Sequence, residues 1–165
     1  MNLKIHQVKI EKDKETNIIL GQSHFIKTAE DLFEAALNSV PEIQVGIAFC
    51  EASMDRLVRV EGNDEKLKSL AAKNAYAIGA GHTFIMMIKK AFPINLLGAV
   101  KAVPEVCFIY CATANDVTVL VGENEQGRGI IGVVDGQPPL GIEKEEDREK
   151  RRRLLREVIK YKLGV

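Results

Sequence analysis

The chain has no tryptophan, few aromatic residues and no net charge. Aromatic residues make up 5% of its 165 positions, so surfaces on which the bases of a nucleic-acid strand could stack are scarce. Lysine and arginine number 23, as do aspartate and glutamate, which gives a formal net charge of zero. No global field therefore attracts nucleic acid or an anionic membrane, and we expect neither as a partner.

Long apolar runs are also missing. The longest, residues 83–88 and 107–112, are far shorter than the roughly 20 residues of a membrane-spanning helix. The first ten residues lack the apolar core and the cleavage site of a secretory signal. Cys50, Cys107 and Cys111 form neither a C-x-x-C pair nor a set with histidines at zinc-ligand spacing. We expect a cytoplasmic protein without a tightly bound metal.

The composition is that of a folded globular protein. Hydrophobic residues make up 46% and charged residues 28% of the chain. No internal repeat, low-complexity linker or break in composition divides it. At this length one hydrophobic core is the rule, so we expect a single domain over residues 1–165.

Apolar periodicity predicts an α/β protein, a three-layer sandwich around a mixed β-sheet. Residues 3–10 and 17–25 are expected to be strands joined as a hairpin by the polar turn 12–16, and 43–51 and 57–60 to form a second hairpin. Further strands are expected at 82–90, 105–113, 117–121 and 128–134. Helices are expected from Thr28 to Pro41, from Asn63 or Asp64 to a stop at Gly79, and over 94–103.

The last part of the chain has a different pattern. Residues 143–163 predict a long charged C-terminal helix with i to i+4 ion pairs such as Glu146 with Lys150. Only its second half, with Leu154 and Val158 among others, has an apolar face. The first half is expected to project into solvent or onto a partner subunit. The basic run 150–153 is neutralised by acidic residues of the same helix, so it does not indicate nucleic-acid binding.

Polar residues follow several apolar runs directly, where ligands of open α/β sheets usually bind. The candidate binding or catalytic residues at these strand ends are Ser23, His24, Glu51, Ser53, Asn115, Asp135 and Gly136. Nearby glycines allow backbone N–H groups to approach a phosphate or a base. Together they suit a ligand of nucleotide size, although strand ends are polar in most proteins and each cluster alone is also explained as an ordinary turn.

Motifs for phosphate binding are weak. Gly79-Ala80-Gly81-His82 resembles the G-A-G-D sequence of ribokinase-type kinases, but His82 replaces the aspartate and the stretch is better explained as a helix C-cap. The glycines of 127–132 match G-x-G-x-x-G but lead into a strand instead of a helix, and no P-loop sequence occurs. Arg128 could clamp a phosphate through two hydrogen bonds, with a plain turn as the alternative.

Six segments, in order along nearly the whole chain, resemble the adenosine-specific kinase family. They are Ile19-Leu20-Gly21-Gln22-Ser23-His24-Phe25-Ile26-Lys27-Thr28, Phe49-Cys50-Glu51-Ala52-Ser53, Glu61-Gly62-Asn63-Asp64, Phe92-Pro93-Ile94-Asn95, Cys111-Ala112-Thr113-Ala114-Asn115 and Gly132-Val133-Val134-Asp135-Gly136. The resemblance implies an α/β sandwich from a mainly archaeal and thermophilic-bacterial family that binds adenosine or AMP and forms homo-oligomers. It transfers no catalytic motif to particular residues.

Three functions are compatible with these observations. The first is an adenosine kinase that transfers a phosphoryl group to the ribose hydroxyl, using ATP and Mg²⁺. Asp135 or Glu51 would be the general base or a metal ligand, Ser23, His24 and Asn115 would bind the nucleoside, and Arg128 would meet phosphate; Ser53 and Gly136 complete the candidate site. The second is a non-catalytic adenosine or AMP sensor, and the third is an oligomeric scaffold.

Overall fold

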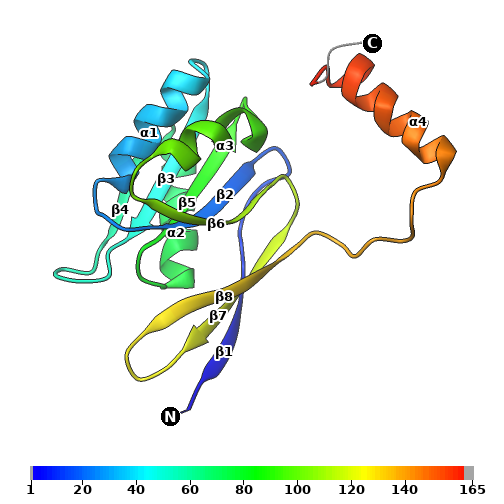
Figure 1. The fold of residues 1–165 in the computed structure, drawn as a ribbon. Helices are drawn as coiled ribbons and strands as arrows, with labels where there is room; N and C mark the ends of the chain where they lie inside the picture. Colours follow the sequence, from blue (N-terminus) through cyan, green and yellow to red (C-terminus); the bar gives the residue numbers. More distant parts are fainter. Residues whose placement is uncertain (1, 162–165) are drawn as a thin grey trace.

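The strands form two separate antiparallel sheets (Figure 1). The computed structural model describes residues 2–161. The larger sheet has the order β4-β3-β5-β2-β6, made of β2 (Asn17–Ser23), β3 (Gln44–Cys50), β4 (Val58–Gly62), β5 (Thr83–Lys89) and β6 (Val106–Thr113). The smaller has the order β1-β7-β8, made of β1 (Lys4–Lys9), β7 (Val117–Glu123) and β8 (Arg128–Asp135).

Helices cover both faces of the larger sheet. Alternate residues of β2 show this: Ile19 packs in one buried cluster with α1 (Thr28–Ser39) and α3 (Pro93–Ala102), whereas Ile18 and Leu20 pack in another with α2 (Glu65–Ile78). Apolar residues of β7 complete the second cluster, so the small sheet shares that face with α2. The α/β sandwich predicted from the sequence is therefore confirmed.

One detail of that prediction is wrong, since every strand pair in residues 2–161 is antiparallel and the sheet is not mixed. The expectation came from continuous apolar strands, which are typical of parallel sheets covered on both faces. Here helices cover both faces of an antiparallel sheet. Burial on both faces explains the apolar runs without any parallel pair.

The expected hairpin between the first two strands is also wrong. β1 pairs with β7, with Val8 opposite Val119, whereas β2 pairs with β5 and β6. The polar turn between them redirects the chain from one sheet into the other. Asp13 organises this turn, because its Oδ1 accepts hydrogen bonds from the Glu15 amide at 3.1 Å and from the Thr16 hydroxyl at 2.7 Å.

The other local signals are confirmed. Residues of β3 and β4 form the second predicted hairpin. Asp64 caps α2, because its Oδ1 accepts from the amides of Lys66 and Leu67, each at 3.0 Å. Gly79 ends the same helix in a left-handed conformation with φ of 62°, and its N–H donates to the Ala75 carbonyl at 2.9 Å. α3 begins at Pro93, as expected.

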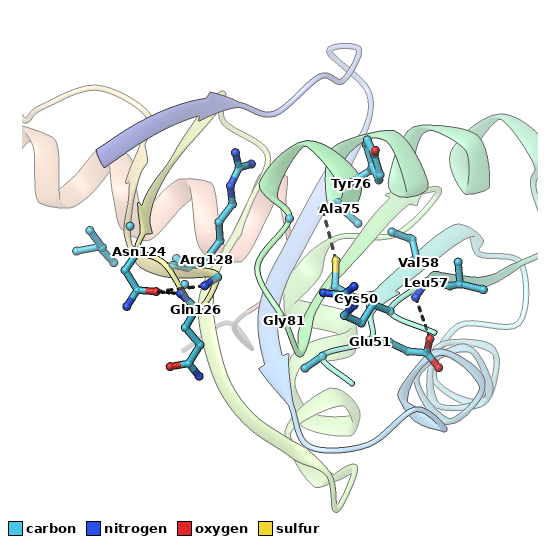
Figure 2. Close-up of a pocket in the computed structure, with 18 of the residues that line it drawn as sticks. Cys50, Glu51, Leu57, Val58, Ala75, Tyr76, Gly81, Asn124, Gln126 and Arg128 are labelled. Atoms are coloured by element: carbon cyan, nitrogen blue, oxygen red, sulfur yellow. Dashed lines mark hydrogen bonds between the residues drawn. The ribbon is translucent and has the colours of Figure 1, made fainter. Parts of the chain in front are cut away.

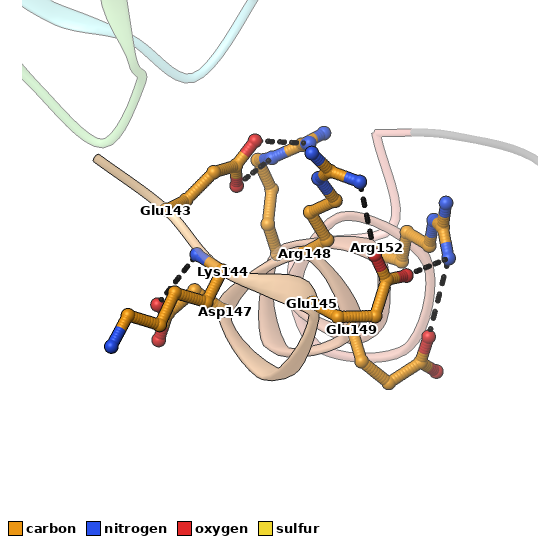
Figure 3. A network of polar contacts seen from close by, with 8 residues as sticks. Glu143, Lys144, Glu145, Asp147, Arg148, Glu149 and Arg152 are labelled. Carbon is orange, nitrogen blue, oxygen red and sulfur yellow. Dashed lines mark hydrogen bonds and ion pairs between the residues drawn. The ribbon is translucent and has the colours of Figure 1, made fainter.

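The C-terminal helix stands away from the two sheets at the end of an extended segment, residues 136–144 (Figure 1). It consists of α4 (Glu145–Arg153) and a π-helical turn, η1 (Leu154–Val158); the predicted end at residue 163 lies outside the described residues. No residue of α4 is buried. Its ion pairs are mainly at i to i+3 instead of the expected i to i+4. Lys150 pairs with Asp147 at 3.5 Å and not with Glu146. Arg148 pairs with Glu145 at 2.9 Å and Arg152 with Glu149 at 3.6 Å (Figure 3).

None of the helices within residues 2–161 is both long enough and apolar enough to cross a lipid bilayer.

Candidate functional site

Antiparallel pairing brings termini of four neighbouring strands, β3, β5, β2 and β6, together in a row at one end of the larger sheet. The His82 amide donates to the Cys50 carbonyl at 2.8 Å, and the Ser23 amide donates to the His82 carbonyl at 2.9 Å. The His24 amide continues the series by donating to the Glu105 carbonyl at 2.8 Å. We call this row, from Cys50 and Glu51 through His82 and Ser23-His24 to Glu105, the strand-end edge. It contains several of the residues predicted from the sequence.

A second group of predicted residues lies at the opposite edge. Because β6 runs antiparallel to β2, Thr113 at the end of β6 pairs with Ile18 near the start of β2. Asn115 follows, and its Nδ2 donates to Oδ1 of Asp135 at 3.0 Å. Gly136 is beside them, with φ of 69°. These residues form a turn contact between β6 and β8, away from the strand-end edge.

The structure therefore separates Glu51 and Asp135, the two carboxylates considered as a general base or metal ligand. Glu51 follows the last residue of β3 at the strand-end edge, whereas Asp135 is the last residue of β8 in the smaller sheet and contacts Asn115 beyond the opposite end of β6. They cannot share a proton or a metal ion within one copy of the chain. The sequence pattern identified polar strand ends correctly but carried no information on which ends meet.

A cleft of about 760 Å³ opens beside the strand-end edge on the face covered by α2. Its walls are the β3–β4 loop, the end of α2 and the hairpin between β7 and β8 (Figure 2). Of the predicted residues, Glu51 and Arg128 line it, and Gly79, Gly81 and Arg56 line it as well. Ligand pockets of about 300–1,000 Å³ are usual for small molecules, and the volume of this cleft lies within that range.

Arg128 is the first residue of β8, and its side chain is held across the cleft. Its Nε donates to Oε2 of Glu123 at 2.5 Å, and this hydrogen bond from Arg128 is the main reason why the pKa of Glu123 is lowered. The guanidinium reaches toward the end of α2, where a β-carbon added to Gly79 would lie 3.4 Å from Nη1 of Arg128. The contact to Glu123 uses the Nε side of the planar guanidinium group. The edge formed by the two Nη atoms is left to donate hydrogen bonds to an anion.

Glu51 has a structural role in the cleft wall. Its Oε1 accepts from Nη2 of Arg59 at 2.7 Å and its Oε2 accepts from the Leu57 amide at 2.9 Å. The backbone hydrogen bond from Leu57, followed by the bond from Arg59, lowers the pKa of Glu51. Both carboxylate oxygens already accept hydrogen bonds, and these bonds stabilise the ionised form of Glu51. Glu51 is therefore poorly suited to accept a proton from a substrate.

Ser23 and His24 end β2 with different surroundings. Ser23 is buried, and its hydroxyl lies 2.7 Å from that of Thr28 at the start of α1. His24 is exposed, and its ring stands edge-on to that of His82 at a centroid distance of 6.3 Å. Ser53 is exposed in the β3–β4 loop, where its carbonyl accepts from the Arg56 amide at 3.3 Å. Only His24 of the three presents its side chain openly at the edge.

Glu105 is the residue of this edge that sequence reasoning missed. Its side chain is 4% exposed, and neither carboxylate oxygen has a hydrogen-bond partner among the described residues. The nearest cation is Lys27, with Nζ 3.6 Å from Oε2. The available signal was a charged residue directly before the apolar β6, but a sequence does not show that such a residue is buried.

The predicted cofactors, Mg²⁺ and ATP, stay predictions. Within residues 2–161 no group of three or more histidine, cysteine, aspartate and glutamate side chains is arranged to hold a metal ion. Mg²⁺ in phosphoryl-transfer sites is commonly held by one or two carboxylates together with the phosphates of the substrate, so a protein cluster of three is not required. The residues at the strand-end edge offer carboxylates but no complete cage.

Comparisons with known proteins identify a family and a similar solved structure. Residues 8–162 match the family model described as adenosine specific kinase. A crystal structure of the PH1918 protein from Pyrococcus horikoshii OT3 is similar over 99% of this chain and 100% of that chain, with 46% sequence identity and a TM-score of 0.94. A search of curated proteins finds no match.

Proposed function

The chain belongs to the adenosine-specific kinase family, and from this premise we propose that it binds adenosine or AMP at the strand-end edge, with the phosphate of AMP directed to Arg128 in the adjoining cleft. The observation that carries the proposal is the position of Arg128. Its guanidinium is fixed by Glu123 over a cleft that is large enough for a nucleotide. His24 at the exposed edge provides a polar contact for the nucleoside.

The cleft also offers a contact for the base and a second contact for the phosphate. Tyr76 lines it and is 80% exposed, which suits stacking on a purine base. Arg56 lines the opposite loop and adds a second positive charge toward a phosphate. The Gly79-Ala80-Gly81 turn lets a ligand approach its backbone closely. This combination of an aromatic face and two guanidinium groups is suited to AMP more than to adenosine alone.

The finer proposal is phosphoryl transfer from ATP to a ribose hydroxyl, assisted by Mg²⁺. Family membership supports this reaction. In our proposal other groups take the roles first considered for Glu51 and Asp135, because each oxygen of Glu51 already accepts a hydrogen bond and Asp135 contacts Asn115 away from the cleft. Asn115 and Gly136 lie with Asp135 and have no part in the proposed site. A non-catalytic AMP sensor would use the same contacts without a donor.

Titration calorimetry with AMP tests the binding proposal. Replacing Arg128 by alanine should weaken AMP binding on the order of 10- to 100-fold, because a charge-assisted hydrogen bond to the phosphate is lost, while adenosine binding should change little. The control is Lys101→Ala, which removes a positive charge from an exposed position of α3 outside the cleft lining and should retain AMP affinity. A flat titration of the unaltered protein at millimolar AMP and adenosine would reject the proposal and favour the scaffold function.

Turnover separates the kinase from the sensor. AMP formed from adenosine, ATP and Mg²⁺ by the unaltered protein supports the kinase, and binding without turnover supports the sensor. We further propose that the protein is a homo-oligomer in the cytoplasm, with the apolar residues of the C-terminal segment at the contact between copies. Leu140 and Ile142 carry this part of the proposal, because both are almost fully exposed in the single copy.

A further inference from the structure

Helices cover both faces of the larger sheet, but only one face of the small sheet is covered within residues 2–161. Its inner face packs with α2 in one buried cluster, through residues such as Val119 and Val121. Side chains alternate between the two faces along a strand, so Gly122 lies on the outer face together with Ile5, its partner in β1. The exposed face of an antiparallel sheet is usually polar, whereas the side chains around Gly122 are apolar.

Three apolar side chains gather over Gly122, and we call them the outer patch: Leu3, Ile5 and Ile131. A β-carbon added to Gly122 would lie 3.1 Å from Cδ1 of Ile131 and 3.3 Å from Cδ1 of Leu3, so both side chains fold over the glycine. Ile5 lies opposite Gly122 on the neighbouring strand. The three side chains are 57–65% exposed, and none belongs to either buried cluster of the described residues. Adjacent exposed apolar side chains of this kind mark a contact surface.

The C-terminal segment, residues 136–144, is a second apolar surface without a cover. Leu140 is fully exposed and Ile142 is 94% exposed. In an extended chain, two residues at this spacing lie on the same side, about 7 Å from each other. Leu3 and Ile5 of the outer patch have the same spacing in the sequence. Two prolines directly precede Leu140 and restrict the backbone, so less conformational entropy is lost when the segment docks.

The charges beside these two apolar surfaces are opposite. β1 contains two lysines, Lys4 and Lys9, and no acidic residue. Directly after Ile142, residues 143–147 contain four acidic residues and one lysine. Of these four, Glu146 has no ion pair among the described residues. The segment is therefore complementary to the outer patch in both hydrophobicity and charge, which favours it as the occupant over an unrelated partner.

Within one copy the segment leads away from the small sheet (Figure 1), so the occupant comes from a second copy. We propose that segment 136–144 of one copy docks on the outer patch of another, with Leu140 and Ile142 packed against its three apolar side chains. Leu3 and Ile131 also line the cleft, so the contact borders the candidate nucleotide site. This inference rests on the proposed homo-oligomer, because it names the surface that receives the segment.

Light scattering over a range of protein concentrations tests the surface. Ile5→Ser with Ile131→Ser should raise the dissociation constant of the oligomer on the order of 100-fold, because the burial of two large apolar side chains is lost. The matched control is Ile26→Ser with Ile94→Ser, two isoleucines that are 42% and 61% exposed, just before α1 and in α3, and it should leave the mass unchanged. An oligomer unaffected by the patch variant would overturn the inference while leaving the proposed homo-oligomer intact. A monomeric unaltered protein would reject both.

Cross-linking between copies identifies the occupant of the patch directly. Cys107→Ser removes the exposed cysteine, and the other two cysteines are buried. In this background, a copy with Ile5→Cys is mixed with a differently tagged copy with Leu140→Cys and treated with a short bis-maleimide. A covalent product that contains one copy of each is expected. The exposed Met54→Cys in place of Leu140→Cys is the control and should give no such product.

Three other results would overturn the inference. Absence of the mixed product would show that the segment does not reach the patch. A product of Ile5→Cys copies alone, formed in preference to the mixed one, would show that two patches face each other. Cross-linking within a single chain that carries both cysteines, at a concentration where scattering reports a monomer, would place the segment on its own copy.

Discussion

Arg59 donates to Glu51 through Nη2 at 2.7 Å, and this pair fixes the β3–β4 hairpin beside the cleft. Glu51 also accepts from the Leu57 amide, so a single carboxylate joins a strand residue to the backbone of the loop. The side chain was a candidate base in the sequence, but its contacts make it part of the wall. Its effect should therefore appear in stability more than in proton transfer.

Replacing Glu51 by glutamine should lower the Tm at pH 7, because the charge-assisted bonds to Arg59 and Leu57 are weakened at nearly constant volume. The pKa of Glu51 is lowered in the fold from its ordinary value of 4.5, so its contribution is present above pH 4.5 and is lost as the pH falls through the folded value. Urea unfolding at several pH values checks this. The difference between the two proteins should shrink below pH 4.5; a difference that stays constant would contradict it.

Asp13 should stabilise the turn that sends the chain from the small sheet into the large one. The hydrogen bond from Lys89, and then that from Thr16, lower the pKa of Asp13 from 3.8 to about 2. Because the side chain is 56% exposed, solvent screening reduces the effect, and Asp13→Asn should cost about 0.5–1 kcal/mol at pH 7. The stabilisation exists above about pH 4 and disappears toward pH 2. Chemical unfolding at pH 7 and pH 2.5 measures it, with Asp116→Asn at an exposed turn as the control.

Two glycines offer a matched test of backbone conformation. Gly79 has φ of 62° at the end of α2, so Gly79→Ala should destabilise the protein by about 1–2 kcal/mol. Gly98 lies inside α3, is exposed and has open space where a β-carbon would go, so Gly98→Ala should stabilise it by roughly 0.5–1 kcal/mol. Opposite changes in the urea midpoint are expected. Equal signs would mean that the conformation of Gly79 does not limit the choice of residue.

Helix α2 and strand β1 show how much of the fold could be predicted from the sequence. Asp64 and Gly79 mark the ends of α2 through contacts within four residues of themselves, so their roles can be read locally. The pairing of β1 with β7 joins residues more than a hundred positions apart, and nothing in the alternation of Leu3 to Ile10 specifies that partner. Contacts between residues close in the sequence were predicted correctly, whereas the pairing of β1 with a distant strand was not.

Prediction of the candidate site from the sequence has the same limit. His24 and Glu51 were selected because polar residues follow strands, and Arg128 was selected as a possible phosphate clamp; the structure places all three near the strand-end edge or in the cleft. Asp135 was selected by the same rule and belongs to the other edge, because the rule does not include strand direction. Glu105 was not selected at all, because what distinguishes it is burial of a carboxylate without a hydrogen bond among the described residues, which only packing reveals.

Asp135→Asn follows from this geometry as a prediction. The side chain is exposed and bonded to Asn115, away from the cleft, so AMP affinity and any AMP production should stay within about twofold of the unaltered protein. A loss of turnover on the order of 100-fold, as general bases contribute, would restore Asp135 to the mechanism. It would also require that a second copy bring this edge to the site.

Self-association is the last prediction, and it concerns the C-terminal segment. Leu140 is fully exposed, Ile142 is 94% exposed and Val158 is 68% exposed, although all three are large apolar side chains. The acidic first turn and basic last turn of α4 would also match the same helix of a second copy in an antiparallel arrangement. Light scattering should therefore report a multiple of 18.3 kDa at micromolar concentration.

The double variant Leu140→Ser with Ile142→Ser should shift this equilibrium toward the monomer without lowering the Tm of the monomer, because neither side chain packs against the sheets. The matched control is Met54→Ser, a change at another exposed apolar residue. Met54 is in the β3–β4 loop and not in the C-terminal segment, so this variant should have the same oligomer mass as the unaltered protein. A monomeric unaltered protein across the micromolar range would reject the prediction. An oligomer that survives the double variant would place the contact elsewhere, and the exposed Phe108 of the edge strand β6 would be the next position to change.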